Sequence, residues 1–297
     1  MVYDSKTLEN FRKAGKIAAK VRDYAKTLVK PGILYVDVAD AVEKKIFELD
    51  ARPGFPCNIS VNDTAAHHVP LEGETLVFKD GDLVKIDLGV HIEGAIADTA
   101  ISVSLGKNEE NEKLIKASET ALAAAIKLST PGRKVSDIGA AVEQAISALG
   151  FRPIKNLSGH LIDIYDLHSD PSIPNFDSKS NVKLEKGMVI ALEPFATNGD
   201  GFIREGGEIG VYMLEHVTNV RNGRDILEHI ANEYQTLPFA KRWIIRKFGT
   251  MKVNLFLREA VAKGILHSYN VLLEKKGSKV AQTEHTILID ETPEVMT

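Results

Sequence analysis

The first fifty residues alternate apolar and polar positions with a helical period. Apolar residues recur every three or four positions over 8–28, which predicts an amphipathic helix that ends at Pro31-Gly32. A second helical pattern over about 36–49 ends before Pro53. The chain is therefore predicted to begin with two helices that each present one apolar face to a core.

The same order of elements returns one hundred residues later. A helical pattern over about 112–128 ends at Pro131-Gly132, and another over about 135–149 ends before Pro153. Chance would rarely place two helices and both of their breakers at one common offset. The sequence therefore predicts an internal duplication.

The duplication continues into strands, where one acidic residue aligns with another. The segment 79–87 is echoed by 185–193, and the alignment matches Asp87 with Glu193. Both segments are rich in Val, Ile and Leu, which favours buried strands. An acid at the end of each strand is therefore a shared feature of the two copies.

A second pair of strands carries two more acids. The segment 97–103 resembles 283–289, and the alignment matches Asp98 with Glu284. Two similar α+β halves, each with two acids and a histidine, would meet around one central site. The histidines that precede the acids are His67 and His160.

Asp87 and Asp98 flank a predicted hairpin turn. With Ile92 and Glu93 as the central turn residues, the two carboxylates would face each other with Cβ atoms roughly 4.5–5.5 Å apart. Their apolar neighbours would add a desolvation cost. A divalent cation or a shared proton would neutralise the pair. The alternative is that both acids are exposed to solvent on a polar strand face and have no role in binding or catalysis.

Composition narrows the class of protein. The 297 residues are 44% hydrophobic and 26% charged, with a net charge of −4, which gives no reason to expect nucleic acid or an anionic membrane as the main partner. The single cysteine, Cys57, excludes an internal disulfide. The first residues, beginning Met1-Val2, lack the apolar core of a signal peptide, and no apolar run approaches a membrane span. We expect a cytoplasmic protein with no membrane contact.

Five short motifs carry the candidate functional groups in a fixed order. They are Phe55-Pro56-Cys57-Asn58-Ile59-Ser60-Val61-Asn62 with Ala65-Ala66-His67, the hairpin from Asp87 to Asp98, Gly159-His160 with His168 eight residues on, Glu193-Pro194-Phe195-Ala196-Thr197, and Gln282-Thr283-Glu284-His285-Thr286. With these motifs the chain resembles the methionine aminopeptidases of type II, within the pita-bread family of metallohydrolases. The resemblance covers essentially the whole chain. It implies an α+β pita-bread fold with two pseudo-symmetric halves around a dinuclear metal site.

The resemblance implies five metal ligands. Asp87 would bind one metal, and His160 and Glu193 would complete the site of the other. Asp98 and Glu284 would bridge the two ions. Four carboxylates with one imidazole carry too much negative charge for one divalent ion and suit two, which could be Co, Mn, Fe(II) or Zn.

The resemblance also implies the groups that meet the substrate. His67 and His168 would act in catalysis and contact the peptide around the scissile bond without binding a metal, and Glu193 would shuttle a proton while serving as a ligand. Phe55 and Tyr269 would line a pocket for the methionine side chain. Departures from the family's usual pattern occur at His68, Asp163 and Asp166, and they bear on fine specificity rather than on the ligands.

A long insertion supports the assignment to type II. Glu193 and Glu284 are 91 residues apart, whereas Asp87 and Asp98 are 11 apart. The surplus predicts a helical, winged-helix-like subdomain over 210–271, with helices over 225–234, 238–248 and 251–263. The catalytic domain would comprise 1–209 and 272–297, with halves of about 1–106 and 107–297. The chain begins directly at the first half, and this brevity resembles archaeal forms.

The expected activity is the metal-dependent removal of the N-terminal methionine from nascent polypeptides, preferably where the second residue is small, by a monomer. A transient contact with the ribosome would use the basic cluster of the insertion, for which a solvated helix face is the more common explanation. Its members are Lys241, Arg242, Arg246, Lys247 and Lys252. Two other functions stay open: a prolidase or Xaa-Pro aminopeptidase with the same metal set, and a non-catalytic binding protein of the same fold.

Overall fold

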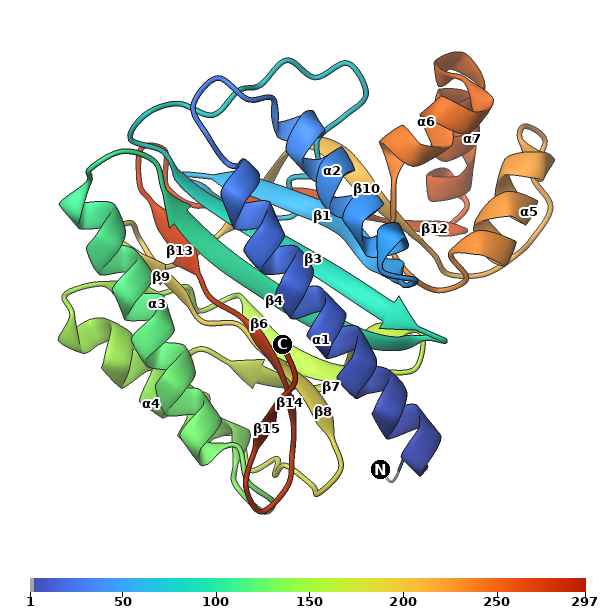
Figure 1. Cartoon of the computed structure of the whole chain (residues 1–297). Helices are drawn as coiled ribbons and strands as arrows, with labels where there is room; N and C mark the ends of the chain where they lie inside the picture. Colours follow the sequence, from blue (N-terminus) through green and yellow to red (C-terminus); the bar gives the residue numbers. More distant parts are fainter. Residues whose placement is uncertain (1–2) are drawn as a thin grey trace.

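The first half of the chain places two helices over a three-stranded antiparallel sheet (Figure 1). The computed structural model describes residues 3–297, so Met1 and Val2 of the segment tested for a signal peptide lie outside it. The apolar faces of the helices form one buried cluster with the sheet, as the helical period predicts. The elements are α1 (Ser5–Leu28), α2 (Tyr35–Glu48), β1 (Arg52–Val61), β3 (Leu83–Ile92) and β4 (Ala95–Ser104), with sheet order β1-β3-β4.

The second half repeats this arrangement with a larger sheet. Two helices, α3 (Glu109–Leu128) and α4 (Val135–Ala148), share a second buried cluster with the strands beneath them. The five-stranded sheet has the order β15-β14-β8-β6-β7 and contains β6 (Ser158–Asp163), β7 (Asp166–Pro174), β8 (Val189–Leu192), β14 (His285–Leu288) and β15 (Glu294–Val295). A three-stranded sheet of order β13-β9-β5 contains β5 (Arg152–Pro153), β9 (Phe195–Thr197) and β13 (Val280–Gln282).

Matching glycines confirm the duplication at the level of backbone geometry. Gly32 and Gly132, the residues after the two helix-ending prolines, have φ values of 86° and 83°. Each donates its N–H to a carbonyl at the matching place, Phe78 in the first half and Leu184 in the second, at 2.8 Å in both cases. A positive φ is readily adopted only by glycine, so both copies keep the same residue for the same reason.

The predicted hairpin register is wrong by one position in each strand. Ile92 pairs with Ala95, so the turn is centred on Glu93 and Gly94, with φ values of 49° and 85°. Two positive φ values are typical of a tight type I′ hairpin turn. As a result Asp98 lies opposite Gly89, and the two aspartates are diagonal neighbours on one sheet face rather than directly opposed.

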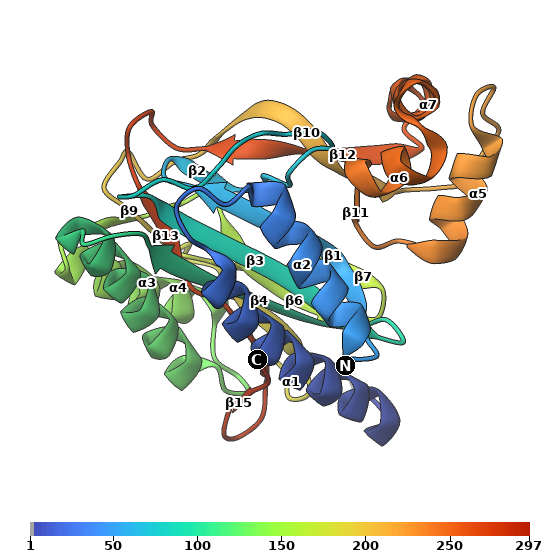
Figure 2. The ribbon, with the colours of Figure 1, turned by 45° about the horizontal axis from the view of Figure 1, so that its top comes forward.

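The segment between β9 and β13 contributes helices and strands to a further sheet (Figure 2). The helices and their supporting strands surround a buried cluster of their own. The predicted helix over 238–248 begins only at Lys241, because Phe239 and Ala240 pair with β10 instead. The elements are β10 (Arg204–Leu214), α5 (Arg224–Glu233), β11 (Phe239–Ala240), α6 (Lys241–Phe248), α7 (Thr250–Ala262) and β12 (Leu266–Leu273), and the sheet order is β11-β10-β12-β2, with β2 at Thr64–Ala66.

Within residues 3–297, the helices all lack the combination of length and apolar character that crossing a membrane requires.

Candidate active site

One cavity of about 220 Å³ brings together all nine residues predicted for the site. It lies between the two halves and the sheet of the insertion. The acids and His160 gather from β3, β4, β6 and the ends of β8 and β14, whereas two aromatic residues and two histidines form other parts of the wall. The predicted residues in its lining are Phe55, His67, Asp87, Asp98, His160, His168, Glu193, Tyr269 and Glu284.

The acids and the imidazole are close enough to share a metal ion. One ligand atom from each of Asp98, His160 and Glu284 lies within 4.8 Å of the others. His160 Nε2 lies 3.8 Å from Asp98 Oδ2 and 3.6 Å from Glu193 Oε1. The structure therefore brings ligand-type atoms from both halves of the chain to one point.

The two halves are joined by hydrogen bonds directly behind these carboxylates. The backbone N–H of Asp98 donates to Thr286 Oγ1 at 2.7 Å, and the same hydroxyl donates to the Asp98 carbonyl at 2.9 Å. Thr99 Oγ1 donates to the Glu284 carbonyl at 2.9 Å, and the Glu284 N–H donates to the Ala100 carbonyl at 3.1 Å. β4 and the strand that carries Glu284 therefore hold each other in position.

Burial makes this cluster of acids electrostatically costly. Burial raises the pKa of Asp87 to about 7, and it raises the pKa of Asp98, Glu193 and Glu284 well above the usual range, with neighbouring acids adding to the effect. Burial also lowers the pKa of His160 to about 4, so its ring is neutral near pH 7. A neutral imidazole beside acids that resist carrying charge is the arrangement that a divalent cation stabilises.

Within residues 3–297, two buried carboxylate oxygens of this cavity lack hydrogen-bond partners. They are Asp87 Oδ1 and Asp98 Oδ1, which are shielded from solvent. Buried polar atoms in native proteins are normally satisfied, and a divalent cation is a partner that would satisfy both oxygens. The residues present therefore fit a divalent metal centre.

Sequence reasoning missed Gln282, although this residue stands in a quoted motif. Its side-chain amide donates to Asp87 Oδ2 at 3.3 Å and to Glu284 Oε2 at 3.2 Å. It is 1% exposed and comes from β13. A neutral donor shared by acids of both halves orients them without adding charge. The signal that could have found it is its place two residues before Glu284, on the same strand face.

The two other predicted histidines line the cavity beside Tyr269. The ring of His67 lies 5.6 Å from that of Tyr269 in an edge-on arrangement, and the ring of His168 lies 6.0 Å from it. His67 has a φ of 62°, which is rare for a residue with a side chain and often marks a functional site. Burial lowers the pKa of His67 to about 4, so it is neutral near pH 7.

The departures from the family pattern have partners outside the cavity. His68 Nδ1 lies 2.7 Å from the Ile59 carbonyl, and its Nε2 lies 3.5 Å from Glu74 Oε2. Asp163 accepts a hydrogen bond from the Tyr3 hydroxyl at 3.0 Å. Asp166 bonds Ser169 on the exposed β7. These three residues lie outside the lining of the cavity.

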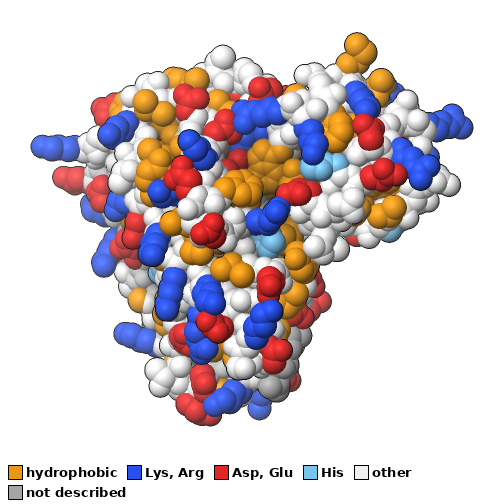
Figure 3. Space-filling view, turned by 45° about the vertical axis from the view of Figure 1, so that its right-hand side comes forward, with side chains coloured by type: hydrophobic (Ala, Val, Ile, Leu, Met, Phe, Trp, Pro, Cys, Tyr) orange, Lys and Arg blue, Asp and Glu red, His pale blue; other side chains and the backbone are white. Residues whose placement is uncertain are grey.

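The basic cluster of the insertion is largely paired within the chain. Each of its Lys and Arg residues except Lys247 forms an ion pair with an acid, and Lys247 contacts His229. Lys and Arg are interspersed with Asp and Glu over the face shown in Figure 3. Paired cations attract a polyanion weakly, which favours the explanation as an internally paired helix face. The expectation of a solvated face is wrong for Arg242, which is fully buried.

Comparison with known proteins agrees with this geometry. The family model for metallopeptidase family M24 matches residues 9–291. The chain is 44% identical to the methionine aminopeptidase of Archaeoglobus fulgidus over 97% of each chain.

Solved structures show the same fold. The methionine aminopeptidase of Thermotoga maritima matches with a TM-score of 0.73 and 25% identity, over 100% of this chain and 98% of that one. A thermophilic Arx1 matches with a TM-score of 0.85 over 99% of this chain and 91% of that one, but at 17% identity this likeness concerns the fold alone. The chain therefore belongs to metallopeptidase family M24, among its methionine aminopeptidases.

Proposed function

We propose that the protein removes the N-terminal methionine from nascent polypeptides in a metal-dependent hydrolysis, preferably where the second residue is small. The observation that carries this proposal is a single cavity with two parts. One part presents four carboxylates and a neutral imidazole, and the other presents aromatic side chains and two further histidines. An enzyme that removes one residue needs a metal-binding part and a side-chain pocket in this proximity.

Two divalent ions would be held by the five ligands assigned above. Asp87 would serve one ion, His160 and Glu193 the other, and Asp98 and Glu284 both. The orphaned oxygens of Asp87 and Asp98 support this assignment, because a cation would satisfy them. When bound, such ions supply Lewis-acid activation of water and of the scissile carbonyl. Calorimetric titration with Co, Mn, Fe(II) or Zn would give the number of ions and the preferred metal.

The remaining steps are assigned to side chains of the chain. Glu193 would accept a proton from the attacking water and pass it to the leaving amine. His67 and His168 would donate hydrogen bonds to the peptide around the scissile bond. Phe55, which is 6% exposed, and Tyr269 would contact the methionine side chain.

The segment 210–271 is proposed as a subdomain on a catalytic domain of 1–209 and 272–297. Its own buried cluster supports this division. A monomer in the cytoplasm that acts on emerging N-termini is the simplest setting for the proposed reaction. A transient ribosome contact stays a prediction, and the paired basic cluster gives it little support.

A comparison of two substrates tests the function. After reconstitution of the protein with several metals, the release of methionine from Met-Ala-Ser is compared with the cleavage of Xaa-Pro peptides. We expect turnover of Met-Ala-Ser and little of the Xaa-Pro peptides. The reverse preference would assign the chain to the Xaa-Pro peptidases. A protein that binds metal yet cleaves neither substrate would support the non-catalytic alternative.

A further inference from the structure

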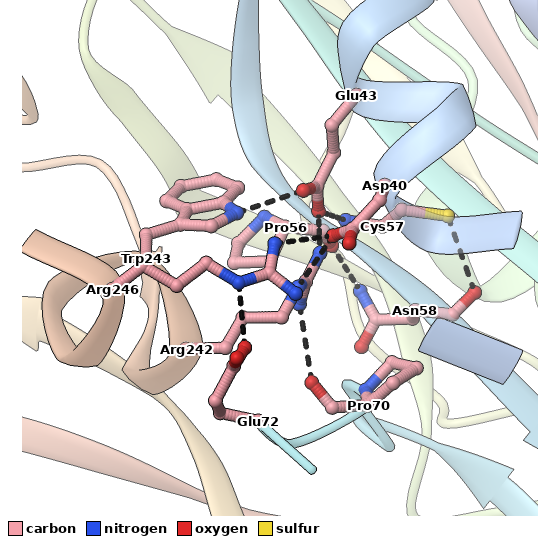
Figure 4. A network of polar contacts seen from close by, with 10 residues as sticks. All are labelled: Asp40, Glu43, Pro56, Cys57, Asn58, Pro70, Glu72, Arg242, Trp243 and Arg246. Atoms are coloured by element: carbon pink, nitrogen blue, oxygen red, sulfur yellow. Dashed lines mark hydrogen bonds and ion pairs between the residues drawn. The ribbon is translucent and has the colours of Figure 1, made fainter. Parts of the chain in front are cut away.

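Arg242 is a fully buried arginine on α6 of the insertion, and it bonds to two other segments of the chain (Figure 4). Its Nη2 donates to Glu43 Oε1 of α2, and its Nε lies 3.3 Å from Asp40 Oδ1 of the same helix. Its Nη1 donates to the Pro70 carbonyl at 3.3 Å. A guanidinium keeps its charge and its planar set of donors when buried, so it can fix the relative positions of several acceptors at once.

One end of this network holds a wall of the active-site cavity. Glu43 Oε1 also accepts the backbone N–H of Cys57 at 3.1 Å. Cys57 stands between Pro56 and Asn58, and both of these residues line the cavity. Glu43 is 5% exposed, so water offers little competition for these bonds. The position of this stretch of β1 therefore depends on the carboxylate that Arg242 binds.

The other end of the network holds a further part of the cavity wall. Pro238 lines the cavity four residues before Arg242, and Ala240 pairs with Val211, which also lines it. Val211 and Ala240 pack with Val69, the neighbour of the Pro70 carbonyl that Arg242 binds. The guanidinium thus links two parts of the cavity wall, the stretch of β1 around Cys57 and the stretch at β11, from outside the cavity.

We propose that Arg242 is a positioning residue that sets the width of the pocket for the first residue of the substrate, and so the selectivity for methionine. This inference rests on the proposed function, because it concerns the same cavity. Arg242 is outside the cavity lining and would act through Glu43 on one wall and through β11 on the other. Small changes in the width of an apolar pocket alter the fit of a substrate side chain without altering the chemistry at the metal centre.

A built-in reporter and a matched control make the proposal testable. Trp243, the single tryptophan, donates its indole N–H to Glu43 Oε2 at 2.7 Å, so its fluorescence reports on the same network. Arg246 lies one turn further along α6 and pairs with Asp40 and Glu72, but it is 40% exposed and contacts no cavity wall. Arg246→Met therefore removes a cation from the same helix and one partner of Asp40, while the bonds of Arg242 to Glu43 and to the Pro70 carbonyl stay in place.

The test variant is Arg242→Met combined with Glu43→Gln, which avoids a lone buried carboxylate. The amide keeps one oxygen acceptor, so only one of the two donors, the Cys57 N–H or the Trp243 indole N–H, stays bonded. Arg242→Lys is the conservative variant that tests rescue. For each protein, kcat and KM are measured with Met-Ala-Ser and Leu-Ala-Ser, together with metal content, Tm and Trp243 emission. These readouts separate a positioning effect from loss of metal or of folding.

For the double variant we expect KM for Met-Ala-Ser to rise and the preference for Met over Leu to fall by about tenfold. The kcat value and the metal content should stay within about threefold of the parent, since the ligands are untouched. Trp243 emission should shift to the red as its indole gains water. Arg242→Lys should recover part of the preference, and Arg246→Met should stay within about twofold of the parent.

An unchanged Met-to-Leu preference in a folded double variant would overturn the inference alone. Loss of kcat and metal at constant preference would also overturn it, since that result would indicate a general structural role. A double variant that does not fold leaves the decision to Arg242→Lys, whose unchanged preference would contradict the proposal. Failure of the parent protein to release methionine would instead overturn the proposed function, and with it this inference.

Discussion

The two halves of the molecule carry equivalent pairs of acids, but the strand pairing around each pair differs. In the first half, Asp87 and Asp98 belong to one hairpin whose strands pair continuously from Leu83 to Ser104. In the second half, β8 ends one residue before Glu193, and β14 begins one residue after Glu284. If the pairing of β8 with β14 continued by one residue, Glu193 would lie opposite Glu284. The two aspartates of the hairpin are instead offset by two positions.

The difference shows how each pair of acids is positioned. The continuous pairing of β3 with β4 sets the register of Asp87 and Asp98 locally, and the backbone of Asp98 also bonds to Thr286 of the second half. The Glu284 N–H has no partner in its own sheet and bonds to the carbonyl of Ala100 in the first half. The second pair of acids is therefore positioned by contacts across the pseudo-symmetry axis, and four changes test this dependence.

The largest loss is expected from the two proposed bridging acids. Asp98→Asn and Glu284→Gln should each abolish turnover and lower metal occupancy, because each removes a charge that serves both ions. Metal analysis beside kinetics measures this effect. Near-normal activity in either variant would contradict the ligand assignment, and a loss confined to one variant would show that the halves do not contribute equally.

A smaller loss is expected from the histidines that meet the peptide. His67→Ala and His168→Ala should keep two ions and lose about 10²–10³ in kcat/KM, the value of a hydrogen bond to a developing oxyanion. His160→Ala should instead lose metal together with activity. The assignment would be reversed if metal content fell in the His67 and His168 variants but held in the His160 variant.

A smaller effect on activity is expected from Gln282, whose side-chain amide bonds to one acid of each half. Gln282→Leu should reduce metal affinity or kcat/KM by about 10–100-fold, because Asp87 and Glu284 lose their shared donor. Thr283→Val is the matched control, since Thr283 Oγ1 bonds Ser118 on α3 at 2.8 Å instead of the acids. Equal kcat/KM values for the two variants would contradict a role for Gln282 in the site.

The smallest effect is expected from the hydroxyl that joins the halves. Thr286→Val should lower the free energy of unfolding by about 1–3 kcal/mol, because both backbone groups of Asp98 lose a buried partner. Chemical denaturation measures this loss, and Thr120→Val on the exposed face of α3 is the control. If the two variants were equally stable, the second half would not depend on this contact.

The ligands could be predicted from the sequence because each stands in a short motif that recurs in the duplicated copy. The alignments of Asp87 with Glu193 and of Asp98 with Glu284 depended only on the local sequence pattern around each residue. The hairpin register was wrong because Glu93 holds a positive φ, for which Asn or Asp would have been the visible signal.

The unpredicted features depend on residues far apart in the chain. Gln282 carries no charge, so no clustering of acids or histidines marked it. Arg242 belongs to a run of basic residues that looked solvent-facing, and its partner Glu43 lies 199 residues earlier. Burial of a charge by so distant a partner leaves no trace in local periodicity, so the role of α6 in the cavity wall appeared only in three dimensions.

The wide spacing of the second pair of acids has a consequence for how the protein folds. Closing a loop of 91 residues costs about 2 kcal/mol more than closing one of 11, if the ends are joined by flexible chain. Local hairpins form within microseconds, whereas non-local strand pairing is slow. We therefore expect β3 and β4 to assemble early and the strand that carries Glu284 to dock late, after the insertion has ordered. Tight metal binding would then arise in the final folding step, so the chain would acquire its cofactor only when it is nearly complete.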